Sequence, residues 1–363
     1  MDYKRRQRRL RASLKELGLE ALLVTHLPNV RYLCGFTGSA GVLAIAEHRA
    51  AFFTDGRYTE QAKAEVSGAR VLVGKGAALP GAVDWLSSAE VRNLGFEADH
   101  VTFAGRQELT KLFRKQGMAG RVRLRSTSGL VEKLRMQKDA AELEQIRSAV
   151  MLASSIFPKI IEKLQPGTSE GRIAAEIEYA CRCSGAEGMA FDTLVSSGLR
   201  SALPHGVASG HPIEKRGFVI LDYGVIVSGY CSDMTRTIHA GPIDGRSRSI
   251  YDAVLQAQLA AIDTVKEGVE AGVVDAAARE VLERSKLARY FTHSTGHGLG
   301  LEIHESPRIA KRQGELLKSG MVITIEPGVY IPGLGGVRIE DTVRVTPSGC
   351  EVLTPTAKDL ITI

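Results

Sequence analysis

The stretch Val219-Ile-Leu-Asp-Tyr-Gly-Val-Ile-Val-Ser-Gly-Tyr-Cys-Ser-Asp233 decides the fold of the second half of the chain. Its two apolar segments flank Ser228-Gly229, a pair typical of a hairpin turn. If residue 227 pairs with residue 230, Asp222 lies opposite Thr235 in the neighbouring strand. Alternate residues of a strand share a face, so Asp222 and Asp233 project from the same face as diagonal neighbours, about 7–8 Å apart.

Two carboxylates this close together on apolar strands repel each other, and a cation between them would relieve the cost. Two further acids, Glu326 and Glu340, end apolar runs in the last third of the chain. Taken singly, an acid at a strand end is usually a cap or a turn residue. The four acids together indicate a metal site.

A histidine-rich segment, His293-Ser-Thr-Gly-His-Gly-Leu-Gly-Leu-Glu-Ile-His-Glu305, lies between the two pairs of acids. Its glycines do not form the dinucleotide-binding pattern, and they argue against a helical zinc pair at His293 and His297. Four carboxylates and one imidazole can hold two divalent ions, and such oxygen-rich ligands favour Mn²⁺ or Co²⁺. Two ions about 3.5–4 Å apart can share a hydroxide and polarise a carbonyl group.

Composition sets the outer limits. The chain has 363 residues, enough for about two domains, and its 44% apolar and 24% charged residues exclude a disordered or mainly coiled-coil protein. No apolar run reaches the length of a membrane span. The net charge of +6 equals the excess in residues 1–15, so we expect a solvated basic first helix and no nucleic-acid-binding face. Five scattered cysteines without a CxxC pair favour a reduced, cytoplasmic protein.

The order of segments predicts two domains. Strand-like and helix-like segments alternate over residues 1–125, which predicts an α/β domain with much parallel sheet. A long amphipathic helical region follows, and Pro158 predicts a kink or two helices there. We place the domains at 1–127 and 128–363. A faint repeat at an offset of 101 residues, in which Gly167 matches Gly268 and Gly171 matches Gly272, suggests that the second domain has two similar halves.

With these residues in view, the sequence resembles the creatinase/prolidase/aminopeptidase P group of metallopeptidases, family M24. The motifs that carry the resemblance are Ala202-Leu-Pro-His-Gly206, Leu221-Asp-Tyr-Gly224, Ser232-Asp-Met-Thr-Arg-Thr237, the segment from His293 to Glu305, Ile325-Glu-Pro-Gly328 and Gly336-Val-Arg-Ile-Glu-Asp341. Asn29-Val-Arg-Tyr-Leu-Cys-Gly-Phe-Thr-Gly-Ser39 and Thr54-Asp-Gly-Arg-Tyr-Thr-Glu-Gln-Ala62 resemble the first domain of the family. The resemblance implies an α+β chain, with a creatinase-type N-terminal α/β domain before a pita-bread catalytic domain.

The resemblance also implies roles for individual residues. Five would hold two divalent ions, Mn²⁺ before Co²⁺ or Zn²⁺: Asp222, Asp233, His297, Glu326 and Glu340. The catalytic residues would be His205 and His304, which assist proton movement and stabilise the oxyanion, and Arg338, which orients a metal-bound carboxylate. Substrate would be bound by His205, His293, His304 and Tyr330. Arg57 would either reach substrate from a partner subunit or cap a helix.

The implied activity is that of an Xaa-Pro aminopeptidase, which removes an N-terminal residue before proline with the aid of a hydroxide shared by two metals. The opening motifs of the first domain favour this over the alternative, an Xaa-Pro dipeptidase (prolidase). A non-catalytic pita-bread binding module and a metal-free creatinase-type hydrolase are disfavoured, because all five ligand positions are kept. We expect peptide substrates with proline second, a homodimer, and no nucleic-acid or membrane partner.

Overall fold

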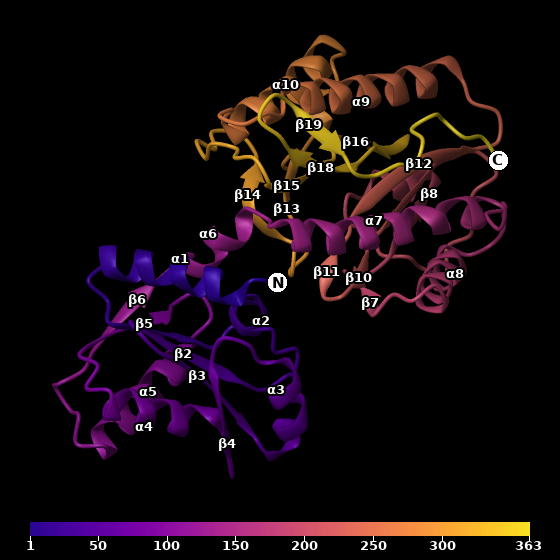
Figure 1. The fold of residues 1–363 in the computed structure, drawn as a ribbon. Helices are drawn as coiled ribbons and strands as arrows, with labels where there is room; N and C mark the ends of the chain where they lie inside the picture. The colour runs from indigo at the N-terminus through magenta and orange to yellow at the C-terminus, as the bar shows by residue number, and fades with distance from the viewer. The chain divides into compact units, whose positions relative to one another are not determined.

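The computed structural model describes residues 1–363, which form two compact units, Met1–Arg135 and Met136–Ile363 (Figure 1). The predicted domain boundary at 127/128 lies just before helix α6 (Leu130–Met136). Helix α6 contacts the first unit, because the Tyr32 hydroxyl donates a hydrogen bond to the Leu134 carbonyl. No helix in either unit has the length and apolar character needed to cross a membrane.

The first unit is built on one six-stranded sheet, in the order β4-β3-β2-β1-β5-β6. The strands are β1 (Ala21–Val24), β2 (Val42–Ala46), β3 (Ala50–Asp55), β4 (Arg70–Gly74), β5 (Asn93–Glu97) and β6 (Arg123–Thr127). The helices are α1 (Tyr3–Glu16), α2 (Leu27–Cys34), α3 (Thr59–Glu65), α4 (Ala78–Ser88) and α5 (Phe103–Lys115). The β3–β4, β1–β5 and β5–β6 pairs are parallel, whereas β2 runs antiparallel to both of its neighbours. The sheet is therefore mixed, with the parallel pairings that the alternating segments predict.

Helix α1 is less solvated than its charge predicts, and that expectation is wrong in part. Its apolar stripe buries Leu10 and Leu14, and Arg6 is buried with them. The Arg6 guanidinium lies 4.3 Å from the centre of the Tyr32 ring and donates to the Tyr32 carbonyl. Its long aliphatic stem allows the side chain to pack like an apolar one while its charged end finds a partner.

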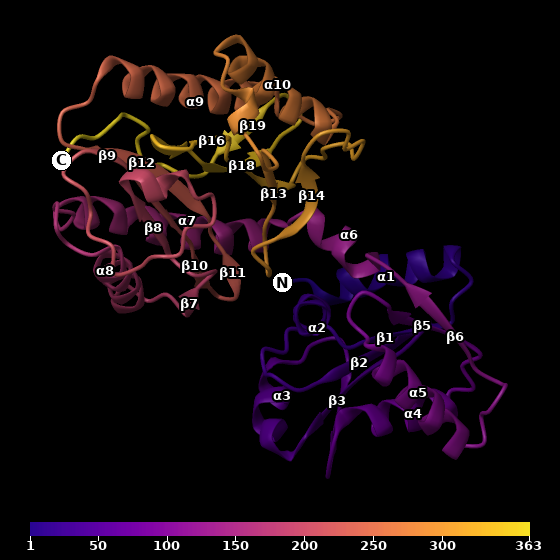
Figure 2. The same ribbon diagram turned by 180° about the vertical axis from the view of Figure 1, so that it is seen from behind.

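The second unit has two layers of helices with its strands between them, as Figures 1 and 2 show from opposite sides. The helices are α7 (Ala140–Ile161), α8 (Glu170–Cys183), α9 (Gly245–Thr264) and α10 (Ala271–Arg284). The strands are β7 (Gly188–Met189), β8 (Leu194–Ser197), β9 (Gly217–Tyr223), β10 (Val225–Val227), β11 (Tyr230–Cys231), β12 (Met234–Ala240), β13 (Gly296–Gly298), β14 (Glu305–Ile309), β15 (Val322–Ile325), β16 (Gly328–Ile331), β17 (Gly335–Arg338), β18 (Asp341–Val345) and β19 (Cys350–Val352).

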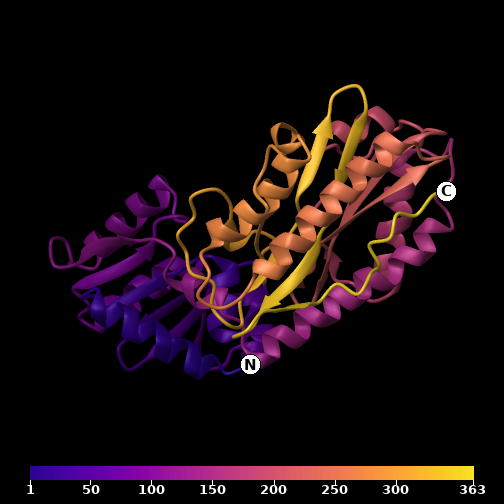
Figure 3. The ribbon, with the colours of Figure 1, turned by 90° about the horizontal axis from the view of Figure 1, so that it is seen from above.

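Two large hydrophobic cores, with a smaller cluster around Ile146 and Val322, hold this unit together. One joins α7 and α8 to β9, β10 and β12, and the other joins α9 and α10 to the strands from β15 to β18. Figure 3 looks onto the layer of α9 and α10. Helix α8 begins at Glu170 and α10 at Ala271, the same offset as the sequence repeat. Each half thus consists of two helices followed by strands.

Pro158 neither divides α7 nor stops it at once. The helix is a single element that continues through Pro158 to Ile161. A proline removes one backbone donor and crowds the preceding turn, and α7 ends three residues beyond Pro158. Of the two predicted alternatives, a kink or two helices, the second is therefore wrong.

Candidate metal centre

The β9–β12 hairpin has the predicted register. Val227 pairs with Tyr230, and Thr235 pairs with Asp222. Between the two acids the chains approach very closely, because a Cβ on Gly224 would lie 1.9 Å from the Ser232 carbonyl oxygen. Only glycine fits there, and this approach holds Asp222, on β9, beside Asp233, which directly precedes β12.

The second half supplies its candidate ligands from strand ends. Glu326 follows β15, and Glu340 lies between β17 and β18. His297 lies on strand β13, in accordance with the argument against a helix, and the register shifts between His297 and Gly298. A Cβ on the neighbouring Gly296 would lie 1.9 Å from the Thr324 carbonyl oxygen, so glycine lets β13 approach β15.

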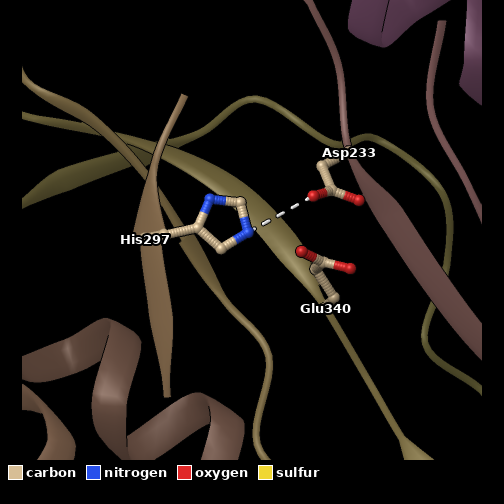
Figure 4. A group of neighbouring side chains, drawn as sticks. All are labelled: Asp233, His297 and Glu340. Atoms are coloured by element: carbon tan, nitrogen blue, oxygen red, sulfur yellow. Dashed lines mark ion pairs between the residues drawn. The ribbon is translucent and has the colours of Figure 1, made fainter. Parts of the chain in front are cut away.

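These side chains meet inside the second unit. Figure 4 shows the imidazole of His297 pointing toward the carboxylates of Asp233 and Glu340. One ligand atom from each of the three lies within 4.8 Å of the others. The Nε2 atom of His297 is 3.5 Å from Asp233 Oδ2 and 3.4 Å from Glu326 Oε1. The arrangement therefore brings three carboxylates around one imidazole nitrogen.

The carboxylates are buried, and two of their oxygens lack partners. Asp222, Asp233 and Glu340 are 8%, 5% and 1% exposed. Asp222 Oδ1 and Glu340 Oε1 accept no hydrogen bond. A buried carboxylate oxygen without a donor is costly, and a cation would satisfy it. The donor set and these two oxygens fit a site for divalent metal ions.

The electrostatics agree with that fit. Burial, and then the charges of Glu340 and its neighbours, raises the pKa of Asp233 well above its ordinary value. Burial likewise raises the pKa of Glu340 and raises that of Glu326 to about 8. Burial lowers the pKa of His297 to about 4, which keeps the imidazole neutral and able to donate its lone pair to a metal. Each carboxyl group would ionise more easily beside a cation.

Arg338 orients two of the carboxylates through hydrogen bonds. Its guanidinium donates to Asp222 Oδ2, to the Tyr330 hydroxyl and to the Pro204 carbonyl. Its Nε donates to the Thr235 hydroxyl at 3.1 Å, and that hydroxyl donates to Glu340 Oε2 at 2.7 Å. Arg338 thus contacts one carboxylate directly and a second through Thr235.

A cavity of about 750 Å³ opens onto this cluster. Its lining includes all five candidate ligands together with His205, His293, His304 and Arg338. The Tyr330 side chain is buried behind the cavity wall, where its hydroxyl lies 2.9 Å from His293 Nε2. The rings of His304 and His297 are 4.5 Å apart. Tyr330 therefore adjoins the cavity through His293 and Arg338, whereas the histidines face it.

Arg57 belongs to the first unit and has a local partner. It forms two hydrogen bonds of 2.9 Å with the Asp55 carboxylate, which also caps the short 3₁₀ helix Gly56–Tyr58. This arrangement accords with the local, helix-capping alternative for that motif.

Three residues near the centre were missed by the sequence analysis. Thr235 is one, and its position opposite Asp222 in the predicted register could have revealed it. Thr324 is another, because its hydroxyl donates to Glu326 Oε1 and accepts from the His297 amide. The third is Arg308, a residue of β14 on the cavity wall, whose exposed side chain forms no hydrogen bond or ion pair within the chain. A lone arginine carries no signal in the sequence.

Comparison with known proteins identifies the family. Residues 144–347 match the model of metallopeptidase family M24, and residues 6–137 match the creatinase/prolidase N-terminal domain. The chain belongs to metallopeptidase family M24. It is a metal-dependent peptide hydrolase, with a creatinase-type N-terminal domain before a pita-bread domain, as its motifs predict.

Several relatives within the family are similar over nearly their whole lengths. An Xaa-Pro dipeptidase of Pyrococcus horikoshii is 37% identical over 94% of this chain and 95% of its own. The structure of an Xaa-Pro dipeptidase from Bacillus anthracis superposes with a TM-score of 0.95, at 41% identity, over the full length of both chains. An X-Pro aminopeptidase structure from Thermotoga maritima gives 0.89 and 33% identity, over 97% of this chain and 100% of that one.

Proposed function

We propose that this M24 peptidase is an Xaa-Pro dipeptidase. The observation that carries the choice of a dipeptide is Arg308, an unpaired cation on the wall of the cavity that holds the candidate metal ligands. A dipeptide, unlike a longer peptide, presents its terminal carboxylate one residue beyond the scissile bond. Arginine is well suited to bind a carboxylate. The similarity to Xaa-Pro dipeptidases along most of the chain supports the same choice.

We assign the metal ligands as the sequence predicts: Asp222, Asp233, His297, Glu326 and Glu340. When bound, two divalent ions would polarise the scissile carbonyl and make a hydroxide nucleophile available at neutral pH. Mn²⁺ is our first candidate, because four of the five ligands are carboxylates. Arg338 keeps the Asp222 carboxylate oriented, and Thr235 does the same for Glu340.

The histidines of the cavity handle substrate and protons. His205 and His304 are exposed to the cavity, where either can donate to the developing oxyanion or carry a proton toward the leaving amine. That amine is proline nitrogen, which carries no hydrogen in the peptide and must gain a proton to leave. Burial lowers the pKa of His293 to about 4. The neutral imidazole of His293 is held by the Ser294 carbonyl at Nδ1 and by the Tyr330 hydroxyl at Nε2, so we expect it to bind substrate by packing its ring against it.

Aminopeptidase activity is the second candidate. The similarity to the Thermotoga X-Pro aminopeptidase supports it, as do the opening motifs of the first domain. The deciding experiment compares an Xaa-Pro dipeptide, its C-terminal amide and an Xaa-Pro-Yaa tripeptide. A dipeptidase prefers the free dipeptide, whereas faster cleavage of the tripeptide would establish the aminopeptidase.

Arg308→Ala tests the basis of that preference. One charge-assisted hydrogen bond contributes about 1.5–3 kcal/mol, so kcat/KM for the dipeptide should fall on the order of 10- to 100-fold. The amide, which lacks the carboxylate, should lose little. Lys311→Ala is the matched control, since Lys311 is exposed a few residues further along and does not line the cavity. Equal losses for dipeptide and amide would contradict the assignment of Arg308.

We also propose that the enzyme is a homodimer, as the family resemblance implies, and that it works in the cytoplasm. All five cysteines are free thiols, as a reducing compartment would keep them. Analytical ultracentrifugation of the metal-loaded enzyme would measure the oligomeric state.

A further inference from the structure

A buried ion pair lies behind the segment that carries His304. Lys138 Nζ is 3.2 Å from Glu305 Oε2, and the two side chains are 1% and 7% exposed. Glu305 directly follows His304, and both residues line the cavity, with the His304 side chain exposed to it. A change in the position of the Glu305 carboxylate would therefore move the neighbouring imidazole.

The segment before His304 has no regular secondary structure. Its residues Leu301–His304 form bends between β13 and β14. The Glu302 amide donates to Glu305 Oε1 at 3.2 Å, and the Gly300 carbonyl accepts from the Cys231 amide at 2.8 Å. One oxygen of Glu305 thus closes the segment on itself, while the other contacts Lys138.

Lys138 reaches this carboxylate from a well-fixed backbone. Its amide donates to the Gly320 carbonyl at 2.9 Å, and Gln137 forms a β-bridge with Met321. The next residue, Asp139, caps α7 in a reciprocal capping box with Glu142. Because both sides of Lys138 are held in place, its ammonium group is a fixed anchor.

Stability alone is a poor reason for such a pair. Burying two charges costs desolvation energy that their attraction barely recovers, and apolar residues of similar volume often serve stability as well or better. What the pair adds is a defined geometry, since the carboxylate must meet the ammonium and the Glu302 amide at once. That geometry is set one residue away from His304.

We infer that Lys138 is a positioning residue for His304, acting through Glu305 and the segment that Glu305 closes. The inference rests on the proposed role of His304 in the reaction. It assigns a function to Lys138, which precedes α7, lies outside the cavity lining and is no candidate metal ligand.

The test consists of two double-mutant cycles. One combines Lys138→Met with His304→Ala, and the other combines Glu305→Gln with His304→Ala. In the native background we expect either change to lower kcat on the order of 10- to 100-fold, the cost of a catalytic group displaced by about 1 Å. KM and bound metal should change by less than about twofold. In the His304→Ala background the same changes should alter kcat by less than about twofold, since there is no imidazole left to position.

Two variants are used because Lys138→Met alone could fail to fold. Lys138→Met leaves a buried carboxylate without its cation, whereas Glu305→Gln keeps the shape and the acceptor for the Glu302 amide. Lys163→Met is the matched control. It removes the cation of another ion pair in the same unit, to Glu176, in which the lysine is 53% exposed, and it should leave kcat unchanged.

The outcomes separate the two ideas. If His304→Ala lowers kcat but Lys138→Met and Glu305→Gln lower it by equal factors in both backgrounds, the positioning inference is overturned and the role of His304 stands. If His304→Ala itself leaves kcat unchanged, the proposed role of His304 fails and the inference fails with it. Loss of bound metal in both Lys138→Met and Glu305→Gln would also overturn the inference.

Discussion

Two buried arginine–carboxylate groups lie close together in the second unit and differ in one respect. Arg236 contacts Asp341 Oδ1 at 2.7 Å, and the other oxygen of Asp341 accepts from Gln258 and Lys358. Arg338 contacts only one oxygen of Asp222 and leaves Oδ1 without a partner. The first group is closed, whereas the second faces a cavity. Burial of charge is common to both, so it is the unsatisfied oxygen that indicates a ligand.

The largest loss of metal binding and activity in the open group is expected on replacing Asp233. Asp233→Ala removes a carboxylate next to both His297 and Glu340, so the protein should lose bound metal and roughly 10³-fold or more of its peptidase activity. Metal analysis and hydrolysis of Xaa-Pro peptides measure the two losses. An Asp233→Ala protein with its metal and activity intact would refute the site.

Asp341→Asn is the matched change in the closed group. Removing one partner of a buried ion pair costs about 3–5 kcal/mol, so the free energy of unfolding should fall by that amount. Bound metal and activity per folded molecule should remain. If Asp341→Asn lost metal as Asp233→Ala does, the distinction between closed and open groups would break down.

Once the metal is removed, the stability of the protein should depend on the ionisation of the carboxylates in the open group. Burial raises the pKa of Glu326 to about 8 in the fold, above its ordinary value, so its contribution to stability is lost as pH rises toward 8. His297 has the opposite sign, because its pKa is lowered to about 4 and it destabilises the fold only below its unfolded value of 6.5. Between pH 6.5 and 8 the carboxyl groups therefore decide the trend.

We expect the melting temperature of the metal-free protein to fall by roughly 5 °C across that window. Added Mn²⁺ should raise it more at pH 8 than at pH 6.5, because fewer protons must then leave the ligands. Differential scanning calorimetry with and without a chelator measures both. A metal-free melting temperature that rises toward pH 8 would contradict the assignment.

A smaller effect is expected at Thr235, which links Arg338 to Glu340. Thr235→Val removes the hydroxyl and keeps the shape, so metal affinity should fall roughly 10- to 100-fold. Thr237→Val is the control on the same strand face, since that hydroxyl bonds only to the backbone of Arg338. Isothermal titration with Mn²⁺ compares them. Equal affinities in the two variants would mean that Thr235 does not act on the ligands.

The smallest effect concerns a third buried arginine, in the first unit. Arg6→Met leaves the Tyr32 carbonyl without this donor and should cost about 1–3 kcal/mol. The neighbouring Arg8 and Arg9 are exposed, and replacing either with Gln should change the free energy of unfolding by less than about 0.5 kcal/mol. Urea unfolding distinguishes them. Equal effects at Arg6 and Arg8 would show that the charge of α1 matters rather than its packing.

The sequence predicts the hairpin of the metal centre well, because strand alternation and a Ser-Gly turn fix which residues face each other. The register from Asp222 to Thr235 follows from those two facts alone. The same local logic predicts the alternation of strands and helices over residues 1–125. The pattern is weakest at β6, a strand at the edge of the sheet, where Arg123 and Arg125 are exposed.

Long-range placement cannot be derived in this way. That His297 meets Asp233 depends on the pairing of β13 with β15 and on a register shift after His297, neither of which leaves a periodic signal. For the same reason Arg308 stays hidden, since only the folded chain places it on the cavity wall. The joint pattern of four acids and the faint repeat suggest that the two pairs meet, and the family resemblance assigns each ligand.

The two close approaches at Gly224 and Gly296 have a consequence for sequence variation. Neither position has room for a side chain, and glycine itself has no side chain with which to bind a metal or a substrate. A library of all single substitutions, selected for peptidase activity, should therefore tolerate changes at these positions as poorly as changes at the ligands themselves. The outline of the active centre would emerge from such a map even if its acids and histidines were left out of the library.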